Sequence, residues 1–356
     1  MSYSLNRKIR DLKPYDPIEG EYQIRLDANE SFLPVPEEIK TGILQAVEET
    51  AFHRYPDSLA KEVSAAFADY YGVDPKHVAV GNGSDESISV ILSAFLMKGD
   101  KILTVSPDFS MYRFYASIVE AESVVLEKEE DLTISVDKLI RTAKEQQVRM
   151  IIFSNPCNPT SLGLQRDEVR RLIRSVDALV VLDEAYMDFW DQSLLGEAAQ
   201  YDNLIILRTC SKAFGMAAIR LGFSVANETL TNAIKAVKSP YNSNTLTQKI
   251  GAELFRHPAL LRQGIQEIID SKQILYRDMK ELEAACHREI LVYESCTNFI
   301  FLRAEKAQQI YDFLLAQSIA VRLFPGHLRI SAGNAQENAA VVAACRQFLL
   351  EGEGKA

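Results

Sequence analysis

A lysine and two hydroxyl side chains follow an apolar run at residues 203–207. The segment reads Arg208-Thr-Cys-Ser-Lys212, and Arg220 stands eight residues after the lysine. A solvated loop would explain the lysine alone. The amine, the hydroxyls and the guanidinium together suit a site that presents a nucleophile and holds an anion.

Two more apolar runs end in residues that could do chemistry. Residues 179–182 lead into Asp183-Glu-Ala-Tyr186, and residues 149–154 lead into Asn155-Pro-Cys-Asn-Pro-Thr-Ser161. Burial of the Asp183 carboxylate is costly without a cation beside it, so we expect such a partner; an N-cap or a structural ion pair is the alternative. The two Asn-Pro pairs indicate an extended, sharply shaped loop, with a plain turn as the alternative.

A fourth run ends at Val80 and leads into Gly81-Asn-Gly-Ser-Asp-Glu86 and a helical pattern. The glycines allow a tight turn, and the free N–H groups at the start of the helix would face an anion; a capped helix without a ligand is the alternative. The four segments together supply an amine, a carboxylate with a nearby tyrosine, an asparagine and a phosphate seat. Pyridoxal 5′-phosphate requires this set of groups.

The elements that carry these segments predict the fold class. Short apolar runs alternate with helical patterns between residues 77 and 238, which indicates an α/β protein with a mostly parallel, doubly wound sheet. Ligands bind at the carboxyl ends of the strands of such a sheet, where the four segments lie. We expect strands at 77–80, 101–106, 123–127, 149–154, 179–183, 203–209 and 222–225, and helices at 84–96, 166–175 and near 230–238.

The pattern changes after about residue 258. A long amphipathic helix at 260–286 precedes strands at 297–303, 320–322 and 328–331 and helices at 306–317 and 336–350. We therefore expect a large cofactor-binding domain at residues 41–258. A smaller α+β domain would combine residues 1–40, which include an N-terminal arm, with residues 259–356.

The composition excludes several classes of protein. A net charge of -10 disfavours binding to nucleic acid or to an anionic membrane, because the summed field repels both. No run reaches the ~18 apolar residues of a membrane span, and the first ten residues lack the apolar segment of a secretory signal. The five cysteines have no metal-site spacing. We expect a cytoplasmic enzyme without a metal.

In this order and spacing, the motifs resemble those of the fold-type I pyridoxal-phosphate aminotransferases, specifically the histidinol-phosphate aminotransferase family. The resemblance runs from about residue 24 to residue 333. It is carried by Leu26-Asp-Ala-Asn-Glu30, Arg54-Tyr-Pro-Asp57, residues 81–86, 155–160, 183–186 and 208–215, Arg220, and Leu328-Arg-Ile-Ser-Ala-Gly333. It implies that L-histidinol phosphate and 2-oxoglutarate are converted to imidazole-acetol phosphate and L-glutamate in histidine biosynthesis.

The resemblance also implies a role for each residue of the site. Lys212 would form the Schiff base with the cofactor, and Asp183 would keep the ring nitrogen protonated. Tyr186 and Asn158 would donate hydrogen bonds to the phenolate oxygen. The cofactor phosphate would bind to the backbone amides of Ser84 and Asp85, the hydroxyls of Thr209 and Ser211, and the guanidinium of Arg220.

Three residues depart from the family pattern. Phe109 stands where the family usually has a tyrosine that stacks on the cofactor ring, so stacking is kept and one hydroxyl donor is lost. Ser161 replaces a usual glycine and Ser31 a common asparagine. Both of these changes affect local loop shape rather than the chemistry at the lysine.

The remaining matches concern the substrate and the partner subunit. Tyr55 would reach the cofactor phosphate of the neighbouring subunit, which implies a homodimer with composite active sites. Arg329 would bind the substrate carboxylate in a bidentate fork. Arg322 and Tyr22 would also contact the substrate, an amino donor or a 2-oxo acid.

Other functions remain open at this point. A threonine-phosphate decarboxylase and an aromatic or broad-specificity aminotransferase would share the same motifs. A regulator that keeps this fold as a ligand sensor would need a DNA-binding module, for which the chain has no spare segment. A nicotinamide-dependent dehydrogenase is disfavoured, because the segment from Gly81 to Glu86 lacks the third glycine of the dinucleotide fingerprint.

Overall fold

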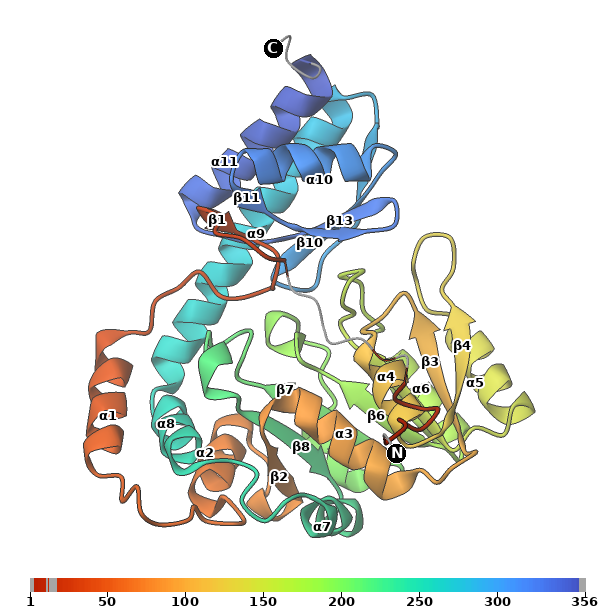
Figure 1. Ribbon diagram of the computed structural model, residues 1–356, viewed down its shortest axis with the longest axis vertical. Helices are drawn as coiled ribbons and strands as arrows, with labels where there is room; N and C mark the ends of the chain where they lie inside the picture. Colours follow the sequence, from red (N-terminus) through yellow and green to blue (C-terminus); the bar gives the residue numbers. More distant parts are fainter. Residues whose placement is uncertain (1–2, 11, 13–17, 352–356) are drawn as a thin grey trace.

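The computed structural model describes residues 3–10, 12 and 18–351. Its largest element is a seven-stranded sheet, drawn in the lower part of Figure 1. In spatial order the strands are β2 (Val78–Gly81), β8 (Gly222–Ala226), β7 (Leu204–Thr209), β6 (Leu179–Asp183), β5 (Met150–Ser154), β3 (Lys101–Ser106) and β4 (Glu122–Glu127). β8 runs antiparallel to its two neighbours, and the other neighbouring strands are parallel.

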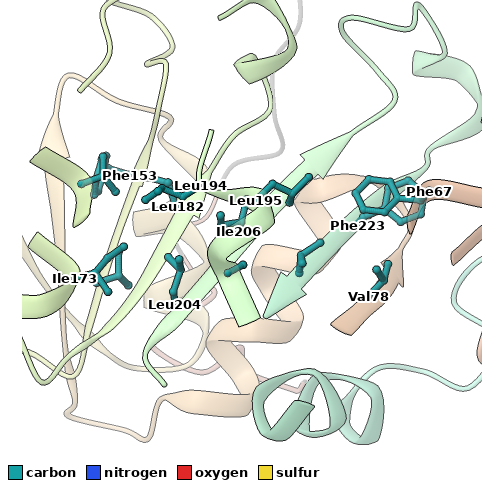
Figure 2. Close-up of a cluster of buried hydrophobic side chains, with 14 of the residues drawn as sticks. Phe67, Val78, Phe153, Ile173, Leu182, Leu194, Leu195, Leu204, Ile206 and Phe223 are labelled. Carbon is teal, nitrogen blue, oxygen red and sulfur yellow. The ribbon is translucent and has the colours of Figure 1, made fainter. Parts of the chain in front are cut away.

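Helices cover both faces of this sheet, because its central strands are buried on both sides. In β5, Met150 and Ile152 face one hydrophobic core, whereas Ile151 and Phe153 face the other. One face is covered by α3 (Gly83–Phe95), α4 (Met111–Ile118) and α7 (Glu228–Val237). The other is covered by α2 (Lys61–Tyr71), α5 (Val136–Glu145), α6 (Arg166–Ser175) and α8 (Thr245–Phe255), and Figure 2 shows part of this core.

A second, four-stranded antiparallel sheet has its own core. Its strands are, in spatial order, β12 (Arg322–Phe324), β13 (His327–Ser331), β10 (Phe299–Ala304) and β9 (Ile290–Val292). α10 (Ala307–Ala316) and α11 (Ala335–Arg346) pack there with the later turns of α9 (Pro258–Ala285). α9 contacts both α8 and β10 and so connects the two cores (Figure 1).

Residues near the N-terminus join both parts of the molecule. β1 (Ile24–Arg25) pairs in parallel with β11 (Ile319–Ala320), and Leu26 belongs to the core of the smaller sheet. α1 (Glu37–Glu48) instead contacts α8 beside the large sheet. The N-terminal segment thus passes between the two cores.

The fold class predicted from the sequence is confirmed, as a mostly parallel doubly wound sheet beside a smaller α+β part. The predicted strand at 320–322 is wrong in one respect, because Val321 separates two strands that pair with different partners. The predicted helix at 336–350 ends at Arg346 and continues as a π-helical turn at Gln347–Glu351. In the part of the chain that the structure describes, no helix is long and apolar enough to cross a membrane.

Candidate active site

The predicted site residues gather where the strands of the large sheet end. Thr209, the last residue of β7, lies opposite Gly222 of β8, and Gly222 lies opposite Gly81 at the end of β2. Asp183 ends β6 and is paired with Ser154, the last residue of β5. The segments that follow these four strands therefore meet at one edge of the sheet.

Hydroxyl and guanidinium donors cluster at this edge. The Ser211 amide donates to the Thr209 hydroxyl (3.1 Å), and that hydroxyl donates to Ser211 Oγ (3.0 Å). Arg220 donates from Nη1 to Ser211 Oγ (3.3 Å), and its Nη2 lies 3.5 Å from Asp85 Oδ2. The cluster holds a guanidinium beside two hydroxyls, a combination that suits an oxyanion.

Two glycines allow the start of α3 to approach this cluster. A Cβ atom on Gly83, whose φ is +81°, would lie 2.5 Å from Arg220 Nη2. A Cβ on Gly222 would lie 2.5 Å from the backbone nitrogen of Ser84. A side chain on Gly83 would thus clash with the guanidinium, and one on Gly222 would clash with the backbone at the start of α3. The free amides of the first turn of α3, with Ser84 and Asp85, thus lie beside Arg220.

Asp183 is a buried carboxylate with two hydrogen-bond donors. The Tyr112 hydroxyl donates to Oδ2 (2.8 Å), and the amide of Ala185 donates to Oδ1 (3.1 Å). Burial raises the pKa of Asp183 to about 7, and the hydrogen bond from Tyr112 opposes this rise. Both donors are neutral groups, so a cation beside the carboxylate would stabilise its charged form further.

Tyr186 contacts the N-terminal segment of the chain. The Asn29 side-chain amide donates to the Tyr186 hydroxyl (2.9 Å), while Ser331 Oγ donates to Asn29 Oδ1 (3.1 Å). Burial raises the pKa of Tyr186 to about 12, and the charge of Arg329 opposes the rise. Tyr186 therefore keeps its proton at neutral pH and can donate it in a hydrogen bond.

Lys212 is half-buried in the same site. Its Nζ donates to the carbonyl oxygen of Ala28 (2.9 Å). Burial lowers the pKa of the amine to about 8, and the positive charge of Arg329 acts in the same direction. A substantial fraction of Lys212 is therefore neutral near pH 8, as a nucleophile or base must be.

Arg329 joins the smaller sheet to the site. It is 7% exposed, its Nη2 donates to the Asp27 carbonyl (2.6 Å), and its Nη1 contacts Oδ1 of Asn158. The guanidinium lies over the ring of Phe299, 5.4 Å from its centroid. The structure thus brings Asn158 and Arg329, 171 residues apart, into direct contact.

Arg322 and Tyr22 lie at the border of this arrangement. Arg322 is opposite Arg329 in the β12–β13 pair. Tyr22 is half-buried two residues before β1. Both act on Tyr311, whose pKa is raised mainly by burial; the charge of Tyr22 adds to the rise and that of Arg322 opposes it.

Two predicted aromatic contacts differ in their surroundings. Phe109 is partly buried and packs edge-to-face on Tyr112, with ring centroids 5.5 Å apart. Tyr55 is 81% exposed and stacks on Tyr241, with centroids 4.6 Å apart. Phe109 thus lies beside the residue that binds Asp183, whereas Tyr55 projects from the surface.

Two residues of the site were not assigned a role from the sequence. Asn29 lies in the segment Leu26-Asp-Ala-Asn-Glu30, which carries part of the family resemblance, so its position in the sequence is a signal. Tyr112 offers none, because it lies within α4 and reaches Asp183 across 71 residues of sequence. Both donate hydrogen bonds to residues that the sequence did single out.

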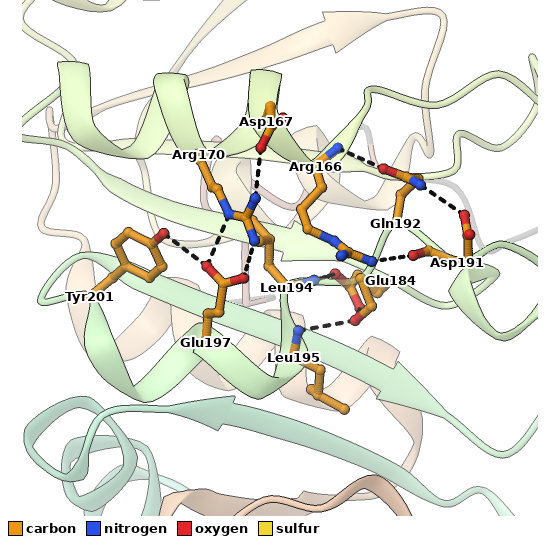
Figure 3. Close-up of polar contacts among 11 residues, drawn as sticks. Arg166, Asp167, Arg170, Glu184, Asp191, Gln192, Leu194, Leu195, Glu197 and Tyr201 are labelled. Carbon is orange, nitrogen blue, oxygen red and sulfur yellow. Dashed lines mark hydrogen bonds and ion pairs between the residues drawn. The ribbon is translucent and has the colours of Figure 1, made fainter.

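A buried ion-pair network lies next to the ends of β6 and β7. Arg208 pairs with Glu184 (2.8 Å) and Asp188 (2.9 Å), and all three side chains are at most 8% exposed. Glu184 also accepts a hydrogen bond from the amide of Leu194 (3.1 Å), as Figure 3 shows. Glu184 directly follows Asp183, so this network fixes the backbone from which Asp183 projects.

Replacing Arg208 by methionine is expected to lower the free energy of unfolding by about 3–5 kcal/mol, because two buried carboxylates lose their cation. Urea unfolding measures this loss. Arg170→Met is the matched control, since Arg170 forms its ion pairs near the surface and should lose at most about 1 kcal/mol. Equal losses in the two variants would show that the buried network contributes no more than a surface pair.

Comparisons with known proteins agree with this geometry. The family described as aminotransferase class I and II matches residues 21–345. The chain is 39% identical to a histidinol-phosphate aminotransferase of Clostridium novyi, with 96% of each chain covered. It is 36% identical to a histidinol-phosphate aminotransferase of Clostridium kluyveri, covering 94% of this chain and 96% of that one.

Among solved structures, the chain resembles histidinol-phosphate aminotransferase from Sinorhizobium meliloti in complex with pyridoxal-5′-phosphate. The TM-score is 0.86 at 20% identity, with 97% of each chain covered. At this identity the likeness concerns the fold. The match to the aminotransferase family and the near-full-length relatives together show that this chain belongs to the class I and II aminotransferases, within the histidinol-phosphate aminotransferase family.

Proposed function

We propose that this chain is a pyridoxal-phosphate-dependent aminotransferase that converts L-histidinol phosphate and 2-oxoglutarate to imidazole-acetol phosphate and L-glutamate. The observation that carries the proposal is the Lys212 amine, whose pKa is lowered to about 8 by burial and by the neighbouring charge of Arg329. Lys212 would thus act as a neutral base beside Arg329, which would bind substrate anions. The relatives at 36–39% identity carry the same name, which favours this activity over a decarboxylase or an aromatic aminotransferase.

The groups around the site fit pyridoxal 5′-phosphate. The hydroxyls of Thr209 and Ser211, the Arg220 guanidinium and the first amides of α3 offer donors to a phosphate. When bound, the cofactor supplies an electron-withdrawing ring that stabilises negative charge at the substrate carbon. Phe109 would cover one face of that ring.

Asp183 and Tyr186 would set the electronic state of the ring. We assign the cationic partner of Asp183 to the protonated ring nitrogen, because the protein donors to this carboxylate are neutral. A cation there lowers the pKa of Asp183 below its value of about 7 and keeps it ionised at neutral pH. Tyr186 and Asn158 would donate hydrogen bonds to the phenolate oxygen.

Lys212 would hold the cofactor before the substrate arrives and then move a proton. Released from the cofactor, its neutral amine would remove the proton from Cα of the amino donor. A positioned base of this kind contributes about 10²–10⁴-fold to the rate. Burial of the site favours the neutral form and so makes the amine available as a base.

Arg329 would serve both substrates in alternate half-reactions. Glutamate offers an α-carboxylate, whereas histidinol phosphate offers a phosphate ester, and the planar guanidinium can bind either oxyanion. Arg322, opposite Arg329 in the sheet, would bind the phosphate, whose additional charge can use a second guanidinium.

We expect Arg329→Lys to slow both half-reactions and Arg322→Ala to slow only the one with histidinol phosphate. A lost charged hydrogen bond of about 1.5–3 kcal/mol corresponds to roughly 10–100-fold. Single-turnover spectra of the cofactor measure each half separately. Arg303→Ala, an exposed arginine of the same sheet, is the control. A normal glutamate half-reaction in Arg329→Lys would reject the shared arginine, and equal slowing of both halves by Arg322→Ala would reject its phosphate role.

We further propose a homodimer in which Tyr55 binds the cofactor phosphate of the partner subunit. The exposure of this side chain, 81%, and its stacking on Tyr241 support a role at an interface. A closed two-fold dimer makes such a contact reciprocal.

In that dimer, Tyr55→Phe should weaken cofactor binding by about 1.5–3 kcal/mol, because one hydroxyl bond to a charged group is lost. Equilibrium titration of cofactor-free protein measures this change. Tyr3→Phe, in which an exposed tyrosine of the N-terminal arm is changed, should bind normally. An active monomer in sedimentation at assay concentration would contradict the composite site.

A division into a large domain at residues 41–258 and a small domain at 1–40 and 259–356 remains our proposal. It is supported by the separate hydrophobic cores of the two sheets. Residues 1–2, 11, 13–17 and 352–356 lie outside the described residues. We also propose a cytoplasmic location, which the five free thiols support.

A further inference from the structure

Lys128 and Cys157 form a close amine–thiol pair beside the candidate active site. Lys128 follows β4, and Cys157 lies in the loop after β5, directly before Asn158. The distance from Lys128 Nζ to Cys157 Sγ is 2.8 Å, and Nζ also donates to Thr160 Oγ1 (3.1 Å). A separation of 2.8 Å is typical of an N–H···O bond, although the acceptor here is the larger sulfur atom.

The surroundings of the pair determine the protonation state of Cys157. Cys157 is 1% exposed, and its Sγ also lies 3.6 Å from Asp108 Oδ1. Burial raises the pKa of the Cys157 thiol, and the charge of Asp108 raises it further, while Lys128 acts in the opposite direction. The thiol is therefore protonated at rest, and the Lys128 nitrogen lies within hydrogen-bond distance of it.

A cavity lies beside Lys128. Its volume is about 220 Å³, and its lining includes Lys128, Leu132, Ile134, Leu162 and Leu164. Lys128 lines this cavity, and its amine contacts the buried sulfur. A space of this volume has room for a molecule the size of hydrogen peroxide.

We propose that Lys128 and Cys157 are an oxidative modification site, at which peroxide links the lysine nitrogen to the cysteine sulfur as a sulfenamide. The proposal is independent of the aminotransferase activity. It assigns a role to a buried nucleophile that the transamination chemistry does not use.

The reaction balances with one equivalent of hydrogen peroxide. The Cys157 sulfur attacks one peroxide oxygen, the O–O bond breaks, and the departing hydroxide takes the thiol proton and leaves as water, which gives a sulfenic acid. The Lys128 ammonium gives one proton to solvent, and its nitrogen then attacks sulfur. The S–O bond breaks, and the second hydroxide leaves as water with a proton from nitrogen. Sulfur loses two electrons and peroxide gains two.

Proximity explains why this pair would react rather than another. The two reacting atoms lie closer than the about 3–3.5 Å of a near-attack arrangement. Cys286, also buried, donates instead to the carbonyl of Glu283. The link would join the residue after β4 to the loop that carries Asn158, and Asn158 contacts Arg329. Oxidation would therefore restrict the movement of this loop at the candidate active site.

The test is peptide mapping by mass spectrometry of the purified full-length protein after treatment with hydrogen peroxide. We expect one cross-linked species that joins the peptides of Lys128 and Cys157, lacks two hydrogens relative to their sum, and disappears on treatment with dithiothreitol. Cys157→Ser and Lys128→Gln should each prevent the link, whereas Cys286→Ser should leave it unchanged.

Several results would overturn the proposal. These are sulfinic or sulfonic acid at Cys157 without any linked peptide, or a link that persists in Lys128→Gln. A linked species that retains one oxygen would overturn the sulfenamide assignment. Because the readout is a mass and not a rate, a protein that lacked aminotransferase activity could still form the link, so the two proposals can fail separately.

Discussion

Replacing Lys212 by alanine is expected to abolish steady turnover. The amine is the group that would hold the cofactor and remove the Cα proton, and loss of a positioned base alone costs about 10²–10⁴-fold in rate. Steady-state formation of glutamate measures the loss, and the visible absorption of the purified protein reports whether the cofactor is still held. Near-normal rates in Lys212→Ala would remove Lys212 from the chemistry.

The lowered pKa of Lys212 adds a pH signature to this result. Because only the neutral amine is a nucleophile, cofactor-free protein should capture pyridoxal phosphate faster as the pH rises through about 8. An exposed lysine would show this rise near pH ~10.4. Lys249, whose side chain donates to the Glu49 carbonyl at the protein surface, can be changed to alanine as a control without effect on capture.

Asp183→Asn is expected to retain the cofactor and lose about 10²–10³-fold in rate. Asparagine keeps the shape of the side chain, but a neutral amide cannot hold the ring nitrogen protonated. Steady-state kinetics with the cofactor content measured in the same samples separates loss of rate from loss of cofactor. The neighbouring carboxylate Asp108 bonds to Ser154 rather than to Asp183, so Asp108→Asn should lose less.

A loss below about threefold in Asp183→Asn would return Asp183 to a structural role. The same would follow if Asp108→Asn and Asp183→Asn lost equal amounts of activity. Asp183 is buried and Asp108 is half-buried. The comparison is informative because both carboxyls have raised pKa values, for which burial is the largest cause.

Most of the large sheet could be predicted from the sequence. Strands buried on both faces have continuous apolar sequences, and for β5 and β7 the predicted and observed ends differ by at most one residue. The helices α1, α2 and α8 were not predicted. The N-cap residues of α1 and α2 are Pro36 and Ala60, and neither forms a side-chain cap, so the usual signals for the start of these two helices are absent.

The two shortest strands show a second limit of prediction from the sequence. β1 and β11 have two residues each and pair with each other across 295 residues of sequence. Two residues carry no periodicity, so their strand conformation depends on the tertiary contact and not on local pattern. The same dependence explains the break at Val321, where the chain leaves one partner strand and joins another.

Residues of the candidate site could be predicted where a side chain suited to catalysis or binding stands at the end of a strand. Asp183 and Thr209 are the last residues of their strands, and Lys212 follows three residues after Thr209. Tyr112 could not be found in this way, because its hydroxyl reaches Asp183 from within a helix. The contact between Asn158 and Arg329 also depends on how the smaller sheet packs against the larger one.

The measurement that tests the account most directly is a pair of single-turnover reactions followed by the absorption of the cofactor. We predict that L-histidinol phosphate removes the visible band of the purified protein and that 2-oxoglutarate then restores it, with one glutamate formed per site and no carbon dioxide released. A protein that lacks a visible band, or that keeps it with histidinol phosphate while releasing carbon dioxide from threonine phosphate, would contradict the proposed function.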